Sequence, residues 1–353
     1  MKVNRRLIFP VIAASVAVIF LIFDMGEEEA EEKAQPTSDE SASPTDLTTV
    51  RSNVVFYNVE NLFDTIDHPD KKDEEFTPGS KKEYGSERYK DKLGKLSRVL
   101  RAASPNPGLI GLCEIENRSV VNDLAKKIDP KANLVVIHEE SPDFRGIDNA
   151  LIYDEDEFDY LWHTAIPVRF AGEDYTTRDI LCVALELKNG EALFVFVNHW
   201  PSRRGGKEKS AFRRARAAEV LRQWMDSLSF ENPTGHLIAM GDYNDYPSDS
   251  SIVNVLGTGP EMNLRNLTLP IHQAGLGSYC YKGEWGVLDQ IIVDSKSAQS
   301  NFFDTTYIFK ENWMLYYNKQ SDDSLPSRSF GGDKYFGGYS DHLPAVTRIS
   351  YSY

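Results

Sequence analysis

Short apolar runs of four to eight residues, separated by polar turns, recur along the chain from about residue 51 onward. Runs of this length that are rich in branched and aromatic residues predict β-strands. They are Asn53–Tyr57, Leu109–Cys113, Leu134–Ile137, Ala150–Tyr153, Ile180–Leu187, Ala192–Val197, Leu237–Met240, Leu288–Val293 and Pro344–Ile349. Two longer stretches, Ser86–Ala103 and Ala211–Leu228, predict helices, because their apolar residues recur at helical spacing.

The predicted strands outnumber the predicted helices, and several are close enough in sequence to form hairpins. This pattern predicts an α/β protein with antiparallel or mixed sheets, and it disfavours a doubly wound parallel sheet. After Val50 no Gly/Pro-rich linker and no internal repeat divides the chain, so Arg51–Tyr353 is predicted to be one domain. Three cysteines cannot form a complete disulfide framework, so the fold is held by its core.

The N-terminus has a different pattern from the rest of the chain. Lys2, Arg5 and Arg6 precede an apolar run from Leu7 to Phe23. Residues 1–23 therefore resemble a signal peptide or an N-terminal membrane anchor. A spanning helix needs ~20 residues, so the run is marginal. We favour an uncleaved anchor because no small-residue cleavage site follows, with a buried N-terminal helix as the remaining alternative. Export or anchoring predicts a periplasmic, extracellular or membrane-attached protein outside the cytoplasm.

Residues 24–50 are acidic and then rich in Ser, Thr and Pro, with nine acidic residues and one base, Lys33. Such a segment cannot bury enough apolar surface to order itself, so it is predicted to be a disordered linker. It also contributes much of the formal net charge of −15. The body is less acidic than the whole chain indicates, but its charge still excludes a general polyanion-binding protein.

Polar residues with complementary chemistry follow the apolar runs at their carboxyl ends. A lone acid in such a place is usually a cap or turn residue. Here six runs are followed by acids, amides or imidazoles. This set of residues is more typical of binding a phosphate and a divalent metal than of packing. The residues are Asn58, Glu114, Asn198-His199, Asp242 with Asn244, Asp289, and Ser340-Asp341-His342.

Taken in order, these elements resemble the endonuclease/exonuclease/phosphatase superfamily. That superfamily includes deoxyribonuclease I, abasic-site exonucleases, neutral sphingomyelinases and inositol-polyphosphate phosphatases. The resemblance extends from about Arg51 to the C-terminus, and the N-terminal segment indicates a bacterial exported member. It implies a four-layer sandwich of two mixed, largely antiparallel sheets flanked by helices. It also implies a metal-dependent phosphoesterase.

The resemblance assigns metal binding to acids and an amide near the strand ends. Glu114 offers a hard carboxylate oxygen, the ligand that Mg²⁺ prefers, with Mn²⁺ or Ca²⁺ as alternatives. Asn58 and Asp341 are expected to complete or orient that shell. Glu116, two residues on, is the rival ligand. We favour Glu114 because the acid of this family directly follows the strand.

Catalytic roles are expected for the remaining polar residues. His342 is the candidate general base, and Asp289 would hold its second ring nitrogen. Asp242 would orient or deprotonate the attacking water, and Asn244 would donate to a phosphate oxygen. A protonated His199 would stabilise the transition state or assist the leaving oxygen. The division of base and acid among these residues is not uniform in the family.

Four arginines are candidates for binding the phosphate groups of the substrate. Arg203 and Arg204 begin a cationic run just after His199, which is either a solvated helix face or a contact for a polyanion. Arg178 resembles a phosphate-contacting arginine of the family, although a surface salt bridge is equally consistent. Arg145 has the same two interpretations.

The sequence thus predicts an exported, Mg²⁺-dependent phosphodiester hydrolase that uses in-line attack by water. Nucleic acid is the favoured substrate, cleaved by an endonuclease of the deoxyribonuclease I type. The first alternative is a phospholipid phosphodiesterase or phosphatase, sphingomyelinase-like or phosphoinositide-directed, which the membrane leader makes credible. The second is an inactive binding or scaffold domain. No protein partner is inferred.

Overall fold

The structure is a computed structural model that describes residues 48–172 and 174–353. The predicted leader (1–23) and nearly all of the predicted linker (24–50) lie outside the described residues. Strand β1 begins at Thr49, before the predicted domain boundary, because its first residues pair with the C-terminal strand β18, Thr49 opposite Ser352. Within the described ranges, no helix is both long and apolar enough to cross a membrane.

The first of two six-stranded sheets has the order β13-β18-β1-β2-β4-β3. Strands β1 and β2 are parallel, and the other neighbours are antiparallel. Two parallel strands at its centre therefore end at the same edge. The strands are β1 (Thr49–Leu62), β2 (Pro107–Ile115), β3 (Leu134–His138), β4 (Asp148–Asp154), β13 (Tyr307–Ile308) and β18 (Ala345–Ser352).

The second six-stranded sheet has the order β5-β6-β7-β8-β12-β9. It too has one parallel pair, β7 with β8, among antiparallel neighbours. Both sheets are thus mixed and largely antiparallel, as predicted. The strands are β5 (Asp159–Ile166), β6 (Ile180–Glu186), β7 (Ala192–His199), β8 (His236–Asp242), β9 (Leu264–Asn266) and β12 (Asp289–Asp294).

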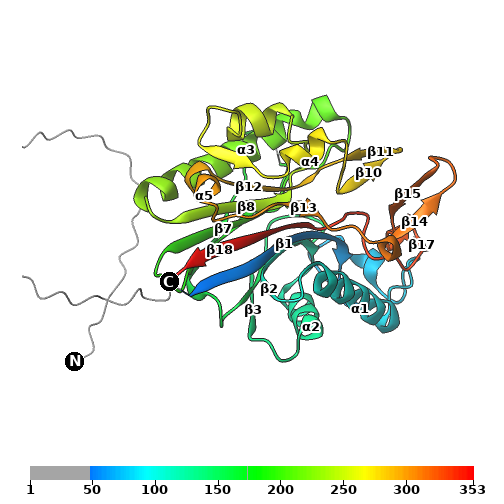
Figure 1. Cartoon of the computed structure of the whole chain (residues 1–353). Helices are drawn as coiled ribbons and strands as arrows, with labels where there is room; N and C mark the ends of the chain where they lie inside the picture. The colour runs from blue at the N-terminus through cyan, green and yellow to red at the C-terminus, as the bar shows by residue number, and fades with distance from the viewer. Residues whose placement is uncertain (1–47, 173) are drawn as a thin grey trace, which may run out of the picture. The chain divides into compact units, whose positions relative to one another are not determined.

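Helices cover the outer face of each sheet, which completes four layers (Figure 1). Helices α1 (Ser86–Ala103) and α2 (Arg118–Ile128) lie against the first sheet, and α3 (Lys207–Glu231) lies against the second. The shorter helices are α4 (Leu269–Gln273), α5 (Ser295–Gln299), two 3₁₀ turns (Glu74–Phe76 and Asn312–Met314) and a π-helical turn (Ser251–Leu256). Three hairpins complete the described fold: β10 (Tyr279–Tyr281) with β11 (Glu284–Gly286), β14 (Leu315–Asn318) with β15 (Asp323–Pro326), and β16 (Phe330–Gly331) with β17 (Lys334–Tyr335).

The core has three apolar layers, and strand β1 shows how the sequence builds two of them. Val54 and Phe56 pack between the sheets, whereas Val55 and Tyr57 pack under α1 and α2. Successive side chains of a strand point to opposite faces. Because both faces are covered, the strand is apolar without alternation. The third layer lies between the second sheet and α3.

Candidate active site

Three of the predicted site residues form one row across the second sheet. His199 on β7 lies opposite Asp242 on β8, and Asp242 lies opposite Asp289 on β12. Residues directly opposite each other on neighbouring strands face the same side of a sheet. All three are buried, with Asp289 at 0% exposure. The strand register alone therefore brings together residues that are far apart in sequence.

Gly241 is required where β7 and β8 end. A Cβ atom at this position would lie 2.5 Å from the backbone oxygen of Asn198, which no larger residue tolerates. Asp242 follows, and its Oδ1 accepts a hydrogen bond from the backbone N–H of Asn244 at 2.9 Å. Asn244 has φ 51°, a left-handed conformation, and its amide donates to the carbonyl of Trp200 at 3.0 Å. The Gly-Asp-x-Asn sequence thus encodes a tight turn that fixes the Asp242 carboxylate.

The first sheet contributes Asn58 and Glu114 from a bulged pair of strand ends. Asn58 is opposite Cys113, but the next paired residues are Leu62 and Ile115, so several β1 residues oppose Glu114 alone. Glu60, Asn61 and Glu114 all have positive φ values, between 49° and 61°. Each such conformation costs about 1–3 kcal/mol and typically occurs at functional sites. The bulge turns the Glu114 carboxylate toward the second sheet.

Asn58 links the two sheets through its amide group. Its Nδ2 donates to Asp242 Oδ2 at 3.1 Å and approaches Glu114 Oε1 at 3.4 Å, while its Oδ1 accepts from the backbone of Glu60. The nitrogen side of the amide faces the carboxylates, so Asn58 orients Glu114. His199 Nε2 lies 3.6 Å from Asp242 Oδ2 and 3.8 Å from Glu114 Oε1.

His342 reaches the same cluster from the loop before β18. Its Nδ1 lies 2.7 Å from Asp289 Oδ2, and its Nε2 lies 3.9 Å from Asp242 Oδ2. Ser340 Oγ donates to the carbonyl of Asn58 at 2.7 Å and accepts from the backbone of His342 at 3.1 Å. The ring of Tyr279 packs against the imidazole at 4.7 Å. This loop is therefore held to both sheets.

The two histidines have opposite pKa shifts. Burial would lower the pKa of His342, but the charge and hydrogen bond of Asp289 and the charge of Asp242 outweigh it and raise that pKa well above its usual value. Burial, followed by the charges of Arg178 and Arg145, lowers the pKa of His199 well below its usual value. These directions differ from the expected roles, in which His342 was a general base and His199 was protonated. Sequence alone does not show that Asp289 is hydrogen-bonded to the His342 imidazole, nor how deeply His199 is buried.

Asp341 lies next to this cluster and is paired with Arg328, a residue that no sequence pattern indicated. Arg328 Nη2 is 2.9 Å from Asp341 Oδ2, and Arg328 Nε is 3.4 Å from Glu60 Oε1. Glu60 also accepts a hydrogen bond from the backbone of Ser329 at 2.6 Å. Arg328 is partly exposed and adjoins the site, so it could meet a phosphate. Arg328 lies in no recognisable motif, so only the fold shows that it adjoins the site.

Glu116, the rival to Glu114, is turned out of this cluster. The bulge at Glu114 breaks the strand alternation that would have placed both acids on one face. Glu116 Oε2 instead accepts from the backbone of Asp64 at 2.6 Å, and burial raises the pKa of Glu116 to about 8. Of the two acids, Glu114 is therefore the one that faces His199.

The four predicted arginines have different environments. Arg178 is buried, 3.2 Å from Asp143 Oδ2, and donates to the carbonyl of Trp200 at 2.7 Å. Arg145 is more exposed and lies 3.7 Å from the same carboxylate. Both charges act on His199. Arg204 is exposed.

Arg203 has a supporting role that the sequence did not predict. It donates to the carbonyl of Asn244 at 2.7 Å and pairs with Asp245 and Asp249 at 3.1 and 2.6 Å. Its guanidinium also stacks on Tyr246 at 4.2 Å. These contacts fix the turn that follows Asp242 and occupy the group that was expected to contact a polyanion.

The donor chemistry of the cluster fits a hard divalent cation. Glu114, Asp242 and Asp289 bring three carboxylates into contact with two imidazoles and the Asn58 amide. Carboxylate oxygens are the ligands that Mg²⁺ prefers, together with water and phosphate oxygens. Of the three, the Glu114 side chain is the most exposed, at 16%. It is therefore the group that an entering ion would meet.

Comparison with known proteins agrees with this architecture. A sequence model described as the endonuclease/exonuclease/phosphatase family matches residues 53–350. Among proteins with curated descriptions, none matches the sequence.

Solved structures of this fold superpose over most of the chain. TDP2 from Caenorhabditis elegans is 12% identical with a TM-score of 0.53, over 85% of this chain and 74% of that one. A mannosyl-6-phosphatase from Bacteroides thetaiotaomicron is 14% identical with a TM-score of 0.54, over 84% and 98%. The human nocturnin catalytic domain with bound sulfate is 15% identical with a TM-score of 0.54, over 86% and 98%. At these identities the likeness shows the fold alone.

Proposed function

The chain belongs to the endonuclease/exonuclease/phosphatase family, and on this basis we propose that it is a divalent-metal-dependent phosphodiesterase that directs water onto phosphorus. One observation carries the proposal. Six side chains form a single buried cluster, and each of the six predicted strand ends contributes one of them. They are Asn58, Glu114, His199, Asp242, Asp289 and His342. A scaffold domain has no use for this arrangement, because buried charges and left-handed residues reduce stability.

Glu114 would hold the cation, with Asn58 orienting its carboxylate and Asp341 nearby. Mg²⁺ is the expected ion, and when bound it supplies Lewis-acid polarisation of a phosphate oxygen. Asp242 is placed to orient and deprotonate water, since burial raises its pKa to about 6 and leaves it a carboxylate at neutral pH. His342, charged through Asp289, would stabilise negative charge on the phosphoryl oxygens, and neutral His199 would hydrogen-bond the phosphate.

Nucleic acid is the proposed substrate class. Support comes from the fold of TDP2, of which the D. rerio protein has been solved in complex with a single-strand DNA product. A second candidate, a small phosphate ester, is favoured by Arg203, whose guanidinium is already paired with Asp245 and Asp249. The fold of the mannosyl-6-phosphatase is consistent with it.

A panel of substrates separates these candidates. The purified protein would be incubated with plasmid DNA, RNA, sphingomyelin, a phosphoinositide, mannose 6-phosphate and bis-p-nitrophenyl phosphate, each with Mg²⁺ and with EDTA. Mg²⁺-dependent cleavage of DNA or RNA supports the nuclease. Hydrolysis of mannose 6-phosphate or bis-p-nitrophenyl phosphate alone supports the second candidate, and cleavage of lipid alone supports the phospholipid alternative. A folded protein inactive on every ester would contradict the enzyme proposal.

We also propose that residues 1–23 export the protein or anchor it, on the strength of their sequence pattern. Cell fractionation followed by sequencing of the mature N-terminus tests this. Recovery of the unprocessed chain in the soluble cytoplasmic fraction would contradict it.

A further inference from the structure

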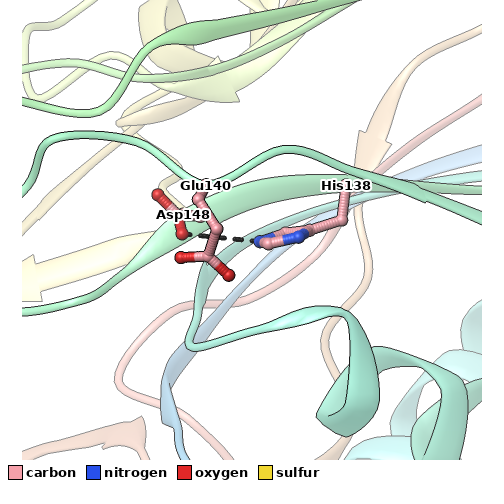
Figure 2. A group of neighbouring side chains, drawn as sticks. All are labelled: His138, Glu140 and Asp148. Atoms are coloured by element: carbon pink, nitrogen blue, oxygen red, sulfur yellow. Dashed lines mark ion pairs between the residues drawn. The ribbon is translucent and has the colours of Figure 1, made fainter. Parts of the chain in front are cut away.

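A second group of potential metal ligands lies in the β3–β4 hairpin (Figure 2). His138 is the last residue of β3, Asp148 is the first residue of β4, and Glu140 lies in the connection. Because His138 is the partner of Ala150 in this antiparallel pair, Glu140 falls opposite Asp148. One ligand atom of each residue lies within 4.8 Å of the others. Figure 2 shows both carboxyl groups on the side of the imidazole that bears the ion pair.

Two buried atoms in this group form an ion pair with each other but make no hydrogen bond. His138 Nε2 and Asp148 Oδ2 make no hydrogen bond to any described residue, although the two side chains are only 3% and 1% exposed. Leaving a buried polar atom unsatisfied costs about 1–3 kcal/mol, and more for a charged group. Asp148 Oδ1, by contrast, accepts from the backbone of Ser141 at 2.9 Å. That bond fixes the carboxylate with its free oxygen toward the imidazole.

The distance between the two free atoms fits a shared ion better than a direct bond. His138 Nε2 and Asp148 Oδ2 are 3.4 Å apart, beyond the usual N–H···O range of about 2.7–3.2 Å. Two ligands at about 2.0–2.1 Å from a tetrahedral Zn²⁺ are separated by roughly 3.3 Å. Histidine with two carboxylates is a zinc-binding set, whereas Mg²⁺ and Ca²⁺ favour oxygen ligands throughout.

Glu140 supplies the third ligand and an approach from solvent. It is exposed, and one of its carboxylate oxygens lies within 4.8 Å of the ligand atoms of His138 and Asp148. The nearby ammonium of Lys71 is bonded to the carbonyls of Ser141 and Asp143, at 2.9 and 3.0 Å. Glu140 also lines a hollow of about 30 Å³, together with His68, Lys71 and Glu116.

We propose that His138, Glu140 and Asp148 bind a structural Zn²⁺ ion that fastens the 139–147 loop to the hairpin. The loop matters for the proposed active site because it carries Asp143 and Arg145. Asp143 pairs with Arg178, which bonds the carbonyl of Trp200 beside His199. The ion would thus fix the side of the catalytic pocket that bears two guanidinium groups. Its binding does not depend on the reaction that the pocket performs.

The test is Zn²⁺ binding by the full-length protein in the presence of excess Mg²⁺, which competes for the proposed catalytic site. Binding would be measured by calorimetry, and protection of residues 139–147 by hydrogen exchange. Glu140→Gln and Asp148→Asn each remove one ligand. Glu139→Gln is the matched control, since that neighbouring carboxylate is bonded at 2.9 Å to His163 on β5 of the second sheet.

We expect the wild type and the Glu139→Gln variant to bind one Zn²⁺ with protection of the loop. Glu140→Gln and Asp148→Asn should weaken that binding at least tenfold and abolish the protection. Glu140 is exposed, so its variant should fold, and a thermal melt in EDTA verifies this. Absence of Mg²⁺-resistant Zn²⁺ binding in the wild type, or equal binding and protection in all four proteins, would overturn the proposal.

Discussion

Replacing Asp289 with asparagine isolates the charge that acts on His342. Asp289 is fully buried, and its Oδ2 lies 2.7 Å from His342 Nδ1. Asparagine has nearly the same volume and can still accept a hydrogen bond from Nδ1–H through its oxygen. The substitution therefore removes the negative charge while keeping the packing. The pKa of His342, which this charge raises, should fall.

The expected loss of activity is much larger than the expected loss of stability. A hydrogen bond to a charged group contributes about 1.5–3 kcal/mol, and a neutral amide retains part of it, so unfolding should become easier by less than ~2 kcal/mol. The equivalent change in a hydrolytic triad, Asp to Asn, lowers kcat by ~10⁴. We expect Asp289→Asn to lower kcat by about 10²–10⁴, which corresponds to roughly 2.7–5.5 kcal/mol of transition-state stabilisation.

The assay compares Asp289→Asn with Asp294→Asn, the same change on the same strand. Asp294 is also buried, but it accepts hydrogen bonds from the backbone of Leu237 and from Ser297, far from the catalytic row. That variant should lose about 1–2 kcal/mol of stability and keep kcat within twofold. Urea denaturation and initial rates on a cleaved ester give both quantities. If Asp289→Asn keeps a near-normal kcat, or if both variants lose activity equally, the reasoning fails.

Three further predictions concern the supports of the site. Lys92 is buried, donates to Ser329 Oγ and the carbonyl of Tyr339, and has its pKa lowered by burial to about 8. A charged Lys92 therefore costs stability at pH 7, and wild type should gain about 2 kcal/mol relative to Lys92→Met between pH 7 and 9.5, as measured by urea denaturation. A constant difference would contradict this. Gly241→Ala should lose more than ~2 kcal/mol and most activity, because its Cβ meets the Asn198 backbone, whereas Gly79→Ala, where the space is open, should lose neither. Arg328→Ala should raise KM more than it lowers kcat if this residue contacts the phosphate, and a change in kcat alone would refute that contact.

Most of the fold was predictable from sequence because the strands are buried on both faces. The run Leu237–Met240 is apolar throughout, and it lies within β8 between two core layers. The helix at Ser86–Ala103 was predicted with the bounds that the structure has. Helix α2 was missed, although its sequence has apolar residues at helical spacing and Asn117 caps its first turn. Strand β5 was missed because it is a half-exposed edge strand with a bulge between Tyr160 and Trp162.

The residues of the candidate site were predictable from the sequence, but their ion-pair partners and protonation states were not. Strand ends that deliver acids and histidines are visible in the sequence, whereas their neighbours across the fold are not. The position of Arg203 just after His199 is typical of a phosphate contact, yet its guanidinium pairs with Asp245 and Asp249. The pKa shifts of the two histidines likewise depend on their burial and on the charges that the fold brings near each ring. The bulge at Glu114, which turns Glu116 away, leaves no sequence signature.

The central claim is that one cluster holds a cation and hydrolyses a phosphate ester. Its most direct test is a Mg²⁺ titration of activity for two matched variants. Glu114→Gln removes the carboxylate that faces His199 and Asp242. Glu116→Gln keeps the hydrogen bond to Asp64 and replaces a group whose pKa burial raises to about 8, so that it is already largely uncharged at neutral pH. We expect Glu114→Gln to lower activity at least 10²-fold and to raise the Mg²⁺ requirement, with Glu116→Gln within twofold of wild type. Full activity in Glu114→Gln, or the loss falling on Glu116→Gln instead, would contradict the account.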